Sequence, residues 1–471
     1  MSFPRYPEYK DSGVEWLGEV PAHWEKLKLS LISLEKCDGP FGSAIKSEHY
    51  RDNGVRVIRL QNIKKYFFNG EDAAYIDSDY YCQRISKSDV VGDDLLIAGL
   101  GDDNNVVGRA CVAPCSIAPA MVKADCFRFR LDTKRALPNF LAYQLSAGAE
   151  ADAGLLSTGS TRSRIPLSTM GTRIVALPPR DEQVKVSAFL DHETTCIDAL
   201  VEEQQRLIEL LNEKRQAVIS HAVTKGLDPD VPMKDSGVEW LGEVPAHWAV
   251  TKVAYHYEVV LGKMLDERRI TGKHLAPYLR NTDVQWDRIN VESLPVMDFS
   301  PADRKKYELK EGDLLVCEGG EVGRSAIWEG QKSECYYQKA LHRMRPLQKS
   351  SESPRFMFYL LWHASEQERF TSMEGKSTIA HLPAETLRQY QFPFPPKSEQ
   401  EMIVGYLDRA SREMNKLVDK AAVAIRLLNE RRSALISAAV TGKIDVRAWQ
   451  ADQQSEQPEL LRAAEERATY G

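Results

Sequence analysis

The strongest constraint on this chain is an internal repeat. The fifteen residues KDSGVEWLGEVPAHW occupy positions 10–24 and recur unchanged at 234–248. Further matches follow each copy: PPRDEQ at 178–183 corresponds to PPKSEQ at 395–400, and LLNEKR corresponds to LLNERR in the segments that follow. Because a long repeat fixes the architecture before any local signal does, we predict two copies of one folding unit with a pseudo-twofold plan.

The composition favours a multidomain globular protein without general affinity for nucleic acid. At 471 residues the chain exceeds the size of one ordinary core. Hydrophobic residues make up 43% and charged residues 28% of the chain, which is typical of globular domains. The formal net charge of −6 argues against a general nucleic-acid coat but is compatible with local basic patches.

The sequence shows no sign of a membrane or secretory destination. No apolar run approaches the roughly 20 residues of a membrane span, and the opening MSFPRYPEYKDSG lacks the apolar core of a secretory signal. The eight cysteines include no C-x-x-C pair, so we expect reduced thiols rather than disulfides or a metal site. A cytoplasmic protein with no membrane partner is the expectation.

Each copy has the same order of segments: a Trp-rich opening, a variable region, a Pro-Pro pair and a long helix. The variable regions contain short β-rich runs, for example at 55–60, 94–97 and 313–316, interrupted by Gly, Asp and Asn. We predict two versions of one small α/β (α+β) domain with divergent surfaces. The expected divisions are the first opening and domain at 1–179, a central helix at 180–226, the second opening and domain at 227–396, a distal helix at 397–443 and a polar tail at 444–471.

The two helices are predicted to be unusually long. Residues 182–224 contain no Pro or Gly, and Gly226 and Pro229 follow. A period of 3.5 residues is typical of coiled-coil packing. In the first helix it fits Ile197, Leu200, Gln204, Leu207, Leu211, Lys214 and Val218, and in the second Met414, Leu417, Ala421, Ala424, Leu428, Arg431 and Leu435. The alternative is a pair of amphipathic helices that each cover a globular core.

No catalytic signature is present in the sequence. A G-x-x-x-x-G-K-[ST] phosphate loop is missing, and the lone G-x-G at 99–101 lacks the following helix of a nucleotide site. His192-Glu193 has no second zinc histidine after it. The Pro-Pro pairs lack the preceding Asn or Asp and the following aromatic of an amino-methyltransferase. We therefore expect no catalytic residue, no metal and no cofactor in this chain.

At this point the order of motifs is recognisable. The chain resembles the specificity subunit of a type I restriction–modification system over nearly its full length. The resemblance is carried by EWLGEVPAHW at 15–24 with its copy, DGPFGS at 38–43, VIRLQNI at 57–63 and LPPRDEQ at 177–183 with the helix behind it. The duplicated order of these motifs is specific, although no single motif is. Between 261 and 278 we find no counterpart of Gly-Pro-Phe-Gly.

The resemblance implies a non-catalytic reader of double-stranded DNA. In that family two target-recognition domains each read one half of a split DNA sequence, and two long antiparallel helices hold them apart and set the unread spacer. Two methylase subunits would bring S-adenosylmethionine, and restriction subunits would bring ATP- and Mg²⁺-dependent cleavage. The alternatives are a single-chain DNA-modifying enzyme with an unrecognised active site and a purely structural coiled-coil scaffold.

Candidate DNA-binding residues fall into three groups. Arg and Lys suit guanine edges, Asn and Gln suit adenine edges, and Lys, Ser and Thr suit phosphates. The first group aligns between the copies: Arg59, Gln61, Asn62, Lys64 and Lys65 against Arg280, Asn281 and Thr282. The second is a pair of Gly-bearing, hydroxyl-rich loops: Ser160, Thr161, Arg162 and Arg164 against Lys376, Ser377 and Thr378. The third is a basic stretch in the second copy: Arg268, Arg269 and Lys273.

Each group has a structural alternative. Arg59 and Arg280 could pair with internal carboxylates, and the loops and the basic stretch could be solvated. The repeated Trp16/Trp24 and Trp240/Trp248 segments are interpreted mainly as latches that pack each domain against the helix pair. Docking of a methylase is the alternative for these segments.

Overall fold

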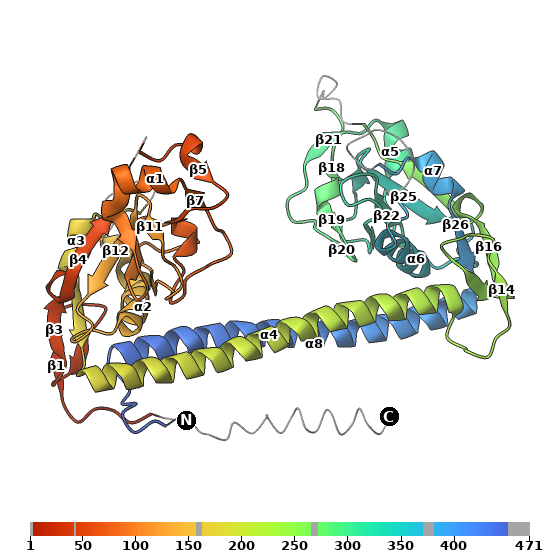
Figure 1. The fold of residues 1–471 in the computed structure, drawn as a ribbon. Helices are drawn as coiled ribbons and strands as arrows, with labels where there is room; N and C mark the ends of the chain where they lie inside the picture. The colour runs from red at the N-terminus through yellow and green to blue at the C-terminus, as the bar shows by residue number, and fades with distance from the viewer. Residues whose placement is uncertain are drawn as a thin grey trace. The chain divides into compact units, whose positions relative to one another are not determined.

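The computed structural model describes residues 3–41, 44–102, 104–156, 163–264, 272–370 and 381–450. The chain forms two compact units (Figure 1). Unit 1 consists of Met1–Glu203 and Val423–Gly471, and unit 2 of Gln204–Ala422. Among the described residues, no helix is both long enough and apolar enough to cross a membrane.

Unit 1 is built on an antiparallel sheet and a mixed sheet. The first has the strand order β10-β9-β12-β4 and the second β5-β7-β6-β11-β8. Their bounds are β4 Ser33–Asp38, β5 Tyr50–Arg51, β6 Val55–Ile58, β7 Tyr75–Ile76, β8 Asp89–Val90, β9 Leu95–Ala98, β10 Ala110–Val112, β11 Ala120–Val122 and β12 Cys126–Leu131. Two pairs flank them: β1 Tyr9–Asp11 with β2 Glu19–Pro21, and β3 Glu25–Lys28 with β13 Ile174–Leu177. The helices are α1 Ser78–Tyr80, α2 Pro138–Leu156 and α3 Leu167–Thr172.

Unit 2 is built on a sheet with the order β17-β25-β22-β23 and a smaller one with the order β21-β18-β24. Their bounds are β17 Tyr257–Leu261, β18 Leu275–Leu279, β21 Val296–Asp298, β22 Leu314–Cys317, β23 Ser325–Ile327, β24 Tyr336–Tyr337 and β25 Leu341–Pro346. Three pairs complete the strands: β14 Met233–Asp235 with β15 Glu243–Pro245, β16 Ala249–Lys252 with β26 Gln391–Phe394, and β19 Val284–Gln285 with β20 Arg288–Ile289. Its short helices are α5 Pro301–Tyr307, α6 Pro354–Glu366 and α7 Ala384–Gln389.

The predicted apolar runs are the central strands of these sheets. All four residues of β9 are buried, and so are all four of β22. Each of these strands lies between two antiparallel neighbours. A strand covered on both faces has no solvent side, so it lacks alternation and is continuously apolar. The prediction of mixed α/β domains is confirmed.

The two long helices begin at the predicted residues and end one and three residues before the predicted ends. The helix α4 covers Arg180–Lys225 and α8 covers Lys397–Val440. Gly226 and Gly442 follow their ends with positive φ angles of 78° and 71°, the left-handed conformation that closes a helix at low cost when the residue is Gly. Each helix contributes residues to both units, because the unit boundaries fall within α4 and within α8.

Within unit 1, α4 and α8 run in opposite directions. The Nζ of Lys185 donates to the carbonyl of Arg447 at 2.9 Å, and further along α4 Asp198 pairs with Arg432. Val186 and Phe189 on α4 share the main core of this unit with Ile436 on α8. The helices therefore form part of the domain core rather than an added surface layer.

Of the fourteen predicted seam positions on the two helices, four are buried, five are half-buried and five are exposed. Ile197, Leu211, Met414 and Ala421 are buried. In contrast, Leu200, Leu207 and Leu417 are 40%, 40% and 45% exposed, and Lys214 and Arg431 are exposed too. Less exposed apolar residues lie one position further along, as Val201 does after Leu200. The prediction was wrong there because one residue corresponds to a rotation of about 100° around the helix, which turns a side chain off the buried face.

The duplicated motifs converge on one carboxylate in unit 1. Glu182, in the first turn of α4, accepts hydrogen bonds from Tyr6 Oη at 2.6 Å and Trp24 Nε1 at 2.9 Å, and His23 Nε2 lies 2.8 Å away. Burial, followed by the bond to Glu182, raises the pKa of Tyr6 well above its ordinary value. The next residue, Gln183, bonds to the backbone of the segment before α2. The Trp-rich opening is thereby fastened to the start of the long helix.

Unit 2 repeats this arrangement. Glu399 accepts a hydrogen bond from Trp248 Nε1 at 3.0 Å and lies 2.8 Å from His247 Nε2. Gln400 accepts the backbone N–H of Ser353 at 2.8 Å. Trp24 and Trp248 are fully enclosed, at 0% and 1% exposure, as the interpretation of these segments as latches predicts. Identical sequence at the opening thus produces an equivalent packing contact in each unit.

Candidate nucleic-acid interface

The aligned Arg59 and Arg280 slots form the same short 3-10 turn in each unit, η4 Leu60–Asn62 and η9 Asn281–Asp283. Asn62 is fully buried, and its side chain accepts the N–H of Arg59 and donates to the carbonyls of Asn69 and Asp72. In unit 2 the carboxylate of Asp283 accepts the N–H of Arg280 at 2.8 Å. The last residue of each turn is therefore a structural brace, and Asn62 has no side-chain group left to present to DNA.

The two arginines of this slot are engaged by carboxylates. Arg59 NH2 donates to Asp72, whose other oxygen accepts from Gln61. Those contacts lower the pKa of Asp72, with the Gln61 bond as the largest cause. Arg280 forms a two-point pair with Asp283 at 2.8 and 2.9 Å, which raises the pKa of the guanidinium. Both arginines therefore form the internal ion pairs that were the structural alternative to a DNA contact.

Two further arginines bind the backbone of these turns, and we did not predict them from the sequence. The buried Arg109 donates to the carbonyls of Leu60 and Ile63 at 2.9 and 2.7 Å. Burial lowers its pKa. In unit 2, Arg324 NH2 donates to the carbonyl of Asn281 at 3.0 Å. A repeated Val-Gly-Arg, at 107–109 and 322–324, was the available signal.

Lys64 and Lys65 lie on a tight turn that leaves the first slot. The backbone N–H of Lys64 donates to the carbonyl of Phe67 at 3.2 Å, and Tyr66 has a positive φ of 74°. Phe67 is 61% exposed at the tip. In unit 2, Thr282 is exposed, whereas the side chain of Asn281 donates to the carbonyl of Gly319 at 2.8 Å. The structure thus keeps Lys64, Lys65 and Thr282 near the surface, and Asn281 in a structural bond.

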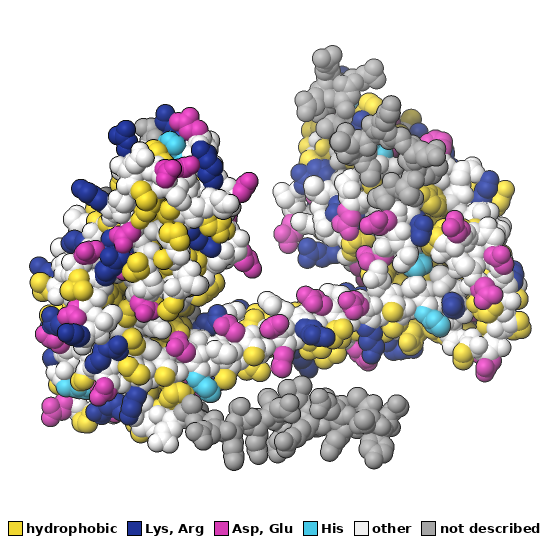
Figure 2. Space-filling model, in the orientation of Figure 1, with side chains coloured by type: hydrophobic (Ala, Val, Ile, Leu, Met, Phe, Trp, Pro, Cys, Tyr) yellow, Lys and Arg dark blue, Asp and Glu magenta, His cyan; other side chains and the backbone are white. Residues whose placement is uncertain are grey.

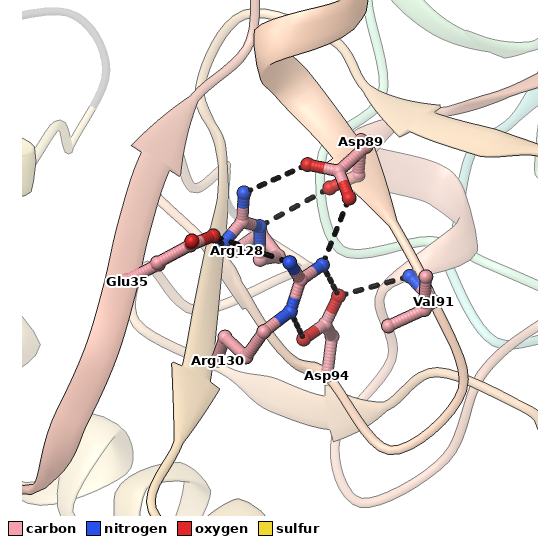
Figure 3. Close-up of polar contacts among 6 residues, drawn as sticks. All are labelled: Glu35, Asp89, Val91, Asp94, Arg128 and Arg130. Carbon is pink, nitrogen blue, oxygen red and sulfur yellow. Dashed lines mark hydrogen bonds and ion pairs between the residues drawn. The ribbon is translucent and has the colours of Figure 1, made fainter.

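An arginine cluster in unit 1 is a scaffold rather than a candidate site (Figure 3). Arg128 is 3% exposed and donates to Glu35 and Asp89, each at 3.0 Å. Arg130 forms a two-point pair with Asp94 at 2.9 and 3.0 Å, and the hydrogen bonds to Asp94 raise the pKa of Arg130 well above its ordinary value. These charges are neutralised within the domain and are not available to a phosphate backbone.

Unit 2 contains a similar cluster. Arg343 NH2 donates to Glu258 at 2.6 Å, and Arg345 pairs with Asp313 at 2.6 and 2.7 Å. The face of the molecule in Figure 2 accordingly shows Lys and Arg interspersed with Asp and Glu. Internal pairing of this kind explains how an acidic chain can contain many arginines and still present few of them to a ligand.

Several candidate residues lie outside the described part of the chain. These are Ser160, Thr161, Arg162, Arg268, Arg269, Lys376, Ser377 and Thr378. Lys273 is described and exposed, next to β18. Arg164, at the end of the first loop, is described, and its side chain is 49% exposed.

Arg164 lies in a well-built corner of unit 1. Its Nε donates to Asp125 Oδ1 at 2.8 Å, and its guanidinium lies over the ring of Phe41 at 5.3 Å. The N–H of Asp125 donates to Asp38 at 3.0 Å. Burial, opposed by the N–H of Gly39, raises the pKa of Asp38 to about 6. Corner 1 is defined as Asp38, Phe41, Asp125 and Arg164.

No metal site accompanies these groups. Across the described ranges, no group of three or more His, Cys, Asp or Glu side chains is arranged to hold a metal ion. The cysteines are free thiols, and burial strongly raises the pKa of Cys111 and Cys126. The thiolate is the reactive form of cysteine, so these two serve as core residues rather than nucleophiles.

Comparison with known proteins gives a consistent result. Residues 258–423 match the model of the type I restriction modification DNA specificity domain. The type I restriction enzyme EcoBI specificity subunit of Escherichia coli is 21% identical over 94% of this chain and 90% of its own length. The EcoKI specificity subunit of E. coli strain K12 is 19% identical over 94% and 93%.

Solved structures show the same fold. A chain from a study of complex assembly and conformational transition of the type I R-M system gives a TM-score of 0.66 at 15% identity, covering 89% of this chain and 98% of its own. The HsdS subunit from Thermoanaerobacter tengcongensis gives a TM-score of 0.55 at 14% identity, covering 90% and 98%. The resemblance inferred from the ordered motifs is confirmed.

Proposed function

This chain belongs to the specificity subunits of type I restriction–modification systems, and we propose that it reads a bipartite DNA target and directs methylase and restriction subunits to it. The main support for this proposal is the family match, which the related specificity subunits extend over nearly the whole chain. The chain is the non-catalytic, DNA-recognising member of such a complex. The comparisons give no support to the alternative of a single-chain modifying enzyme.

The two units each carry one target-recognition domain in this proposal. The linear divisions at 1–179, 180–226, 227–396, 397–443 and 444–471 remain predictions. Buried positions seven residues apart on α8, Met414 and Ala421, support pairing of the long helices as a coiled coil. The equivalent Glu182 and Glu399 contacts support a pseudo-twofold plan.

The partners follow from this plan. A subunit with two equivalent latch regions would accept two copies of one methylase, together with restriction subunits, on double-stranded DNA. S-adenosylmethionine, ATP and Mg²⁺ would be bound by those partners rather than by this chain. We place the assembled complex in the cytoplasm, where its DNA target is.

The test uses the complex of this chain with its methylase. Methyl transfer from S-adenosylmethionine would be mapped over a genome or a random DNA library. We expect one motif with two specified halves and an unspecified spacer, and no transfer by this chain alone. A contiguous motif, transfer without sequence preference, or transfer by the isolated chain would contradict the proposal.

A further inference from the structure

The two units share the backbone of corner 1 but not its side chains. The strand register shows which residues of the two units correspond. Asp38 on β4 pairs with Phe127 on β12, and Leu261 on β17 pairs in the same way with His342 on β25. Asp38 therefore corresponds to Leu261. The N–H of Gly99 donates to the carbonyl of Asp125 as that of Glu318 donates to the carbonyl of Ala340. Asp125 therefore corresponds to Ala340.

The other two positions correspond as well. An isolated bridge joins Leu100 to Arg164, and an equivalent one joins Gly319 to His381. A glycine lies two residues before Phe41, and another lies two residues before Met264: Gly39 and Gly262. Each packs so closely against a neighbouring backbone that an added Cβ would lie 2.2 Å from it. Phe41 and Met264 are 50% and 63% exposed. Corner 2 is defined as Leu261, Met264, Ala340 and His381.

The correspondence between the two corners is not visible in the sequence. Only a Gly is shared between Gly-Pro-Phe-Gly and the 261–264 segment, so no counterpart was found there. The backbone requirement, a glycine where two strands approach closely, is what the two segments have in common. A conserved backbone with exchanged, exposed side chains is what two readers of different sequences need.

Corner 1 presents its guanidinium in a defined way. Asp125 engages Nε, and among the described residues the two terminal nitrogens of Arg164 have no hydrogen-bond partner. Asp125 is itself fixed by Asp38 and by the N–H of Gly99. Two parallel N–H donors at the end of a fixed guanidinium match the O6 and N7 acceptors of guanine in the major groove.

Resting on the proposed function, we propose that Arg164 reads a guanine in the half-site bound by unit 1, and that Asp125 and Phe41 are positioning residues. The carboxylate fixes the direction of the fork, and the ring supports its face by a cation–π contact. In corner 2, Ala340 and His381 take the places of Asp125 and Arg164, so His381 and Met264 specify a different base in the other half-site. An arginine that only bound phosphate would need no such orientation.

The test compares methyl transfer by complexes containing wild-type chain, Arg164→Lys or Asp125→Asn on duplexes randomised in both half-sites. Lys keeps the charge but loses the planar fork, and Asn tolerates the positive φ of 62° at position 125. We expect Arg164→Lys to lose roughly 5- to 150-fold of discrimination at one G·C pair of one half-site. Asp125→Asn should lose less at the same pair.

The matched control is His381→Ala, which should change the other half-site only. Equal loss of transfer over all sequences by Arg164→Lys, with no change in the preferred base at any position, would identify a phosphate contact and overturn the proposal. Unchanged specificity, with the wild-type bipartite motif intact, would overturn it too and leave the proposed function standing. A wild-type complex without any bipartite preference would overturn both.

Discussion

At the scale of single residues, the partners of an arginine decide what it can do. Arg128 and Arg130 place their nitrogens on carboxylates inside the domain and tie strands together. Arg164 places one nitrogen on a carboxylate and leaves its fork exposed. All three residues are arginines in the sequence. Only the three-dimensional positions of Glu35, Asp94 and Asp125 distinguish a structural arginine from one that can contact DNA.

A pH dependence follows from Asp38. Burial raises its pKa to about 6 from an ordinary 3.8, so its ionised form is disfavoured in the folded state. The contribution of protonated Asp38 to folding stability is complete below pH 3.8 and is lost as the pH rises through about 6. We expect Asp38→Asn, which keeps an acceptor for the N–H of Asp125, to gain thermal stability relative to wild type as the pH increases over this window.

The measurement is the melting temperature of the two chains from about pH 3.5 to about pH 7.5, which spans both pKa values. Asp52→Ala, which removes an exposed carboxylate from the same unit, serves as the control and should leave the pH profile of wild type unchanged. Parallel profiles for Asp38→Asn and wild type would show that the ionisation of Asp38 is not penalised by folding.

At the scale of elements, the length and type of the helices could be predicted, but their rotation could not. Neighbouring apolar pairs such as Leu200-Val201 and Leu210-Leu211 fit two seams that differ by one residue. The structure buries Leu211 at 8% exposure and leaves Leu210 51% exposed. Contacts with the rest of the fold decide between such phases, and these contacts are not encoded in the local pattern.

This pair offers a matched test on the isolated chain. Leu211→Ala removes a buried side chain and should lower the free energy of unfolding by about 2–4 kcal/mol. Leu210→Ala has the same chemistry and helix propensity effect at the adjacent exposed site, so it should cost less than about 1 kcal/mol. Denaturant unfolding of both variants measures the difference. Equal losses would mean that the helix is rotated from the position described.

At the scale of the whole molecule, the repeat predicted two units, but not which segments compose them. Unit 1 combines both ends of the chain: the N–H of Asp445 donates to the carbonyl of Pro4 at 2.8 Å, and Tyr9 Oη donates to the carbonyl of Gly442. A division in linear order cannot express this closure. The divergent reading surface was equally hidden, because Met264 occupies the place of Phe41 without any similarity of sequence.

The sharing of α4 and α8 between the units leads to a prediction about spacing. If the helices are the ruler between the half-sites, adding one heptad after Gln204 and one after Ala421 adds about 10.5 Å, or about three base pairs. Both helices must be lengthened, because a heptad in one alone shifts it against its partner. The lengthened complex should methylate the same two half-sites at a longer preferred spacer, measured on duplexes with graded spacers.

The single-helix insertion is the control, and it should lose thermal stability instead of changing the preferred spacer. B-DNA turns once per roughly 10.5 base pairs, so three added pairs also rotate one half-site by about 100°, and the helix pair must supply part of that rotation. Methylation at the original spacer with undiminished rate would show that the helices are not the ruler. In that case the segment at 226–232, which joins α4 to the second opening, would set the distance.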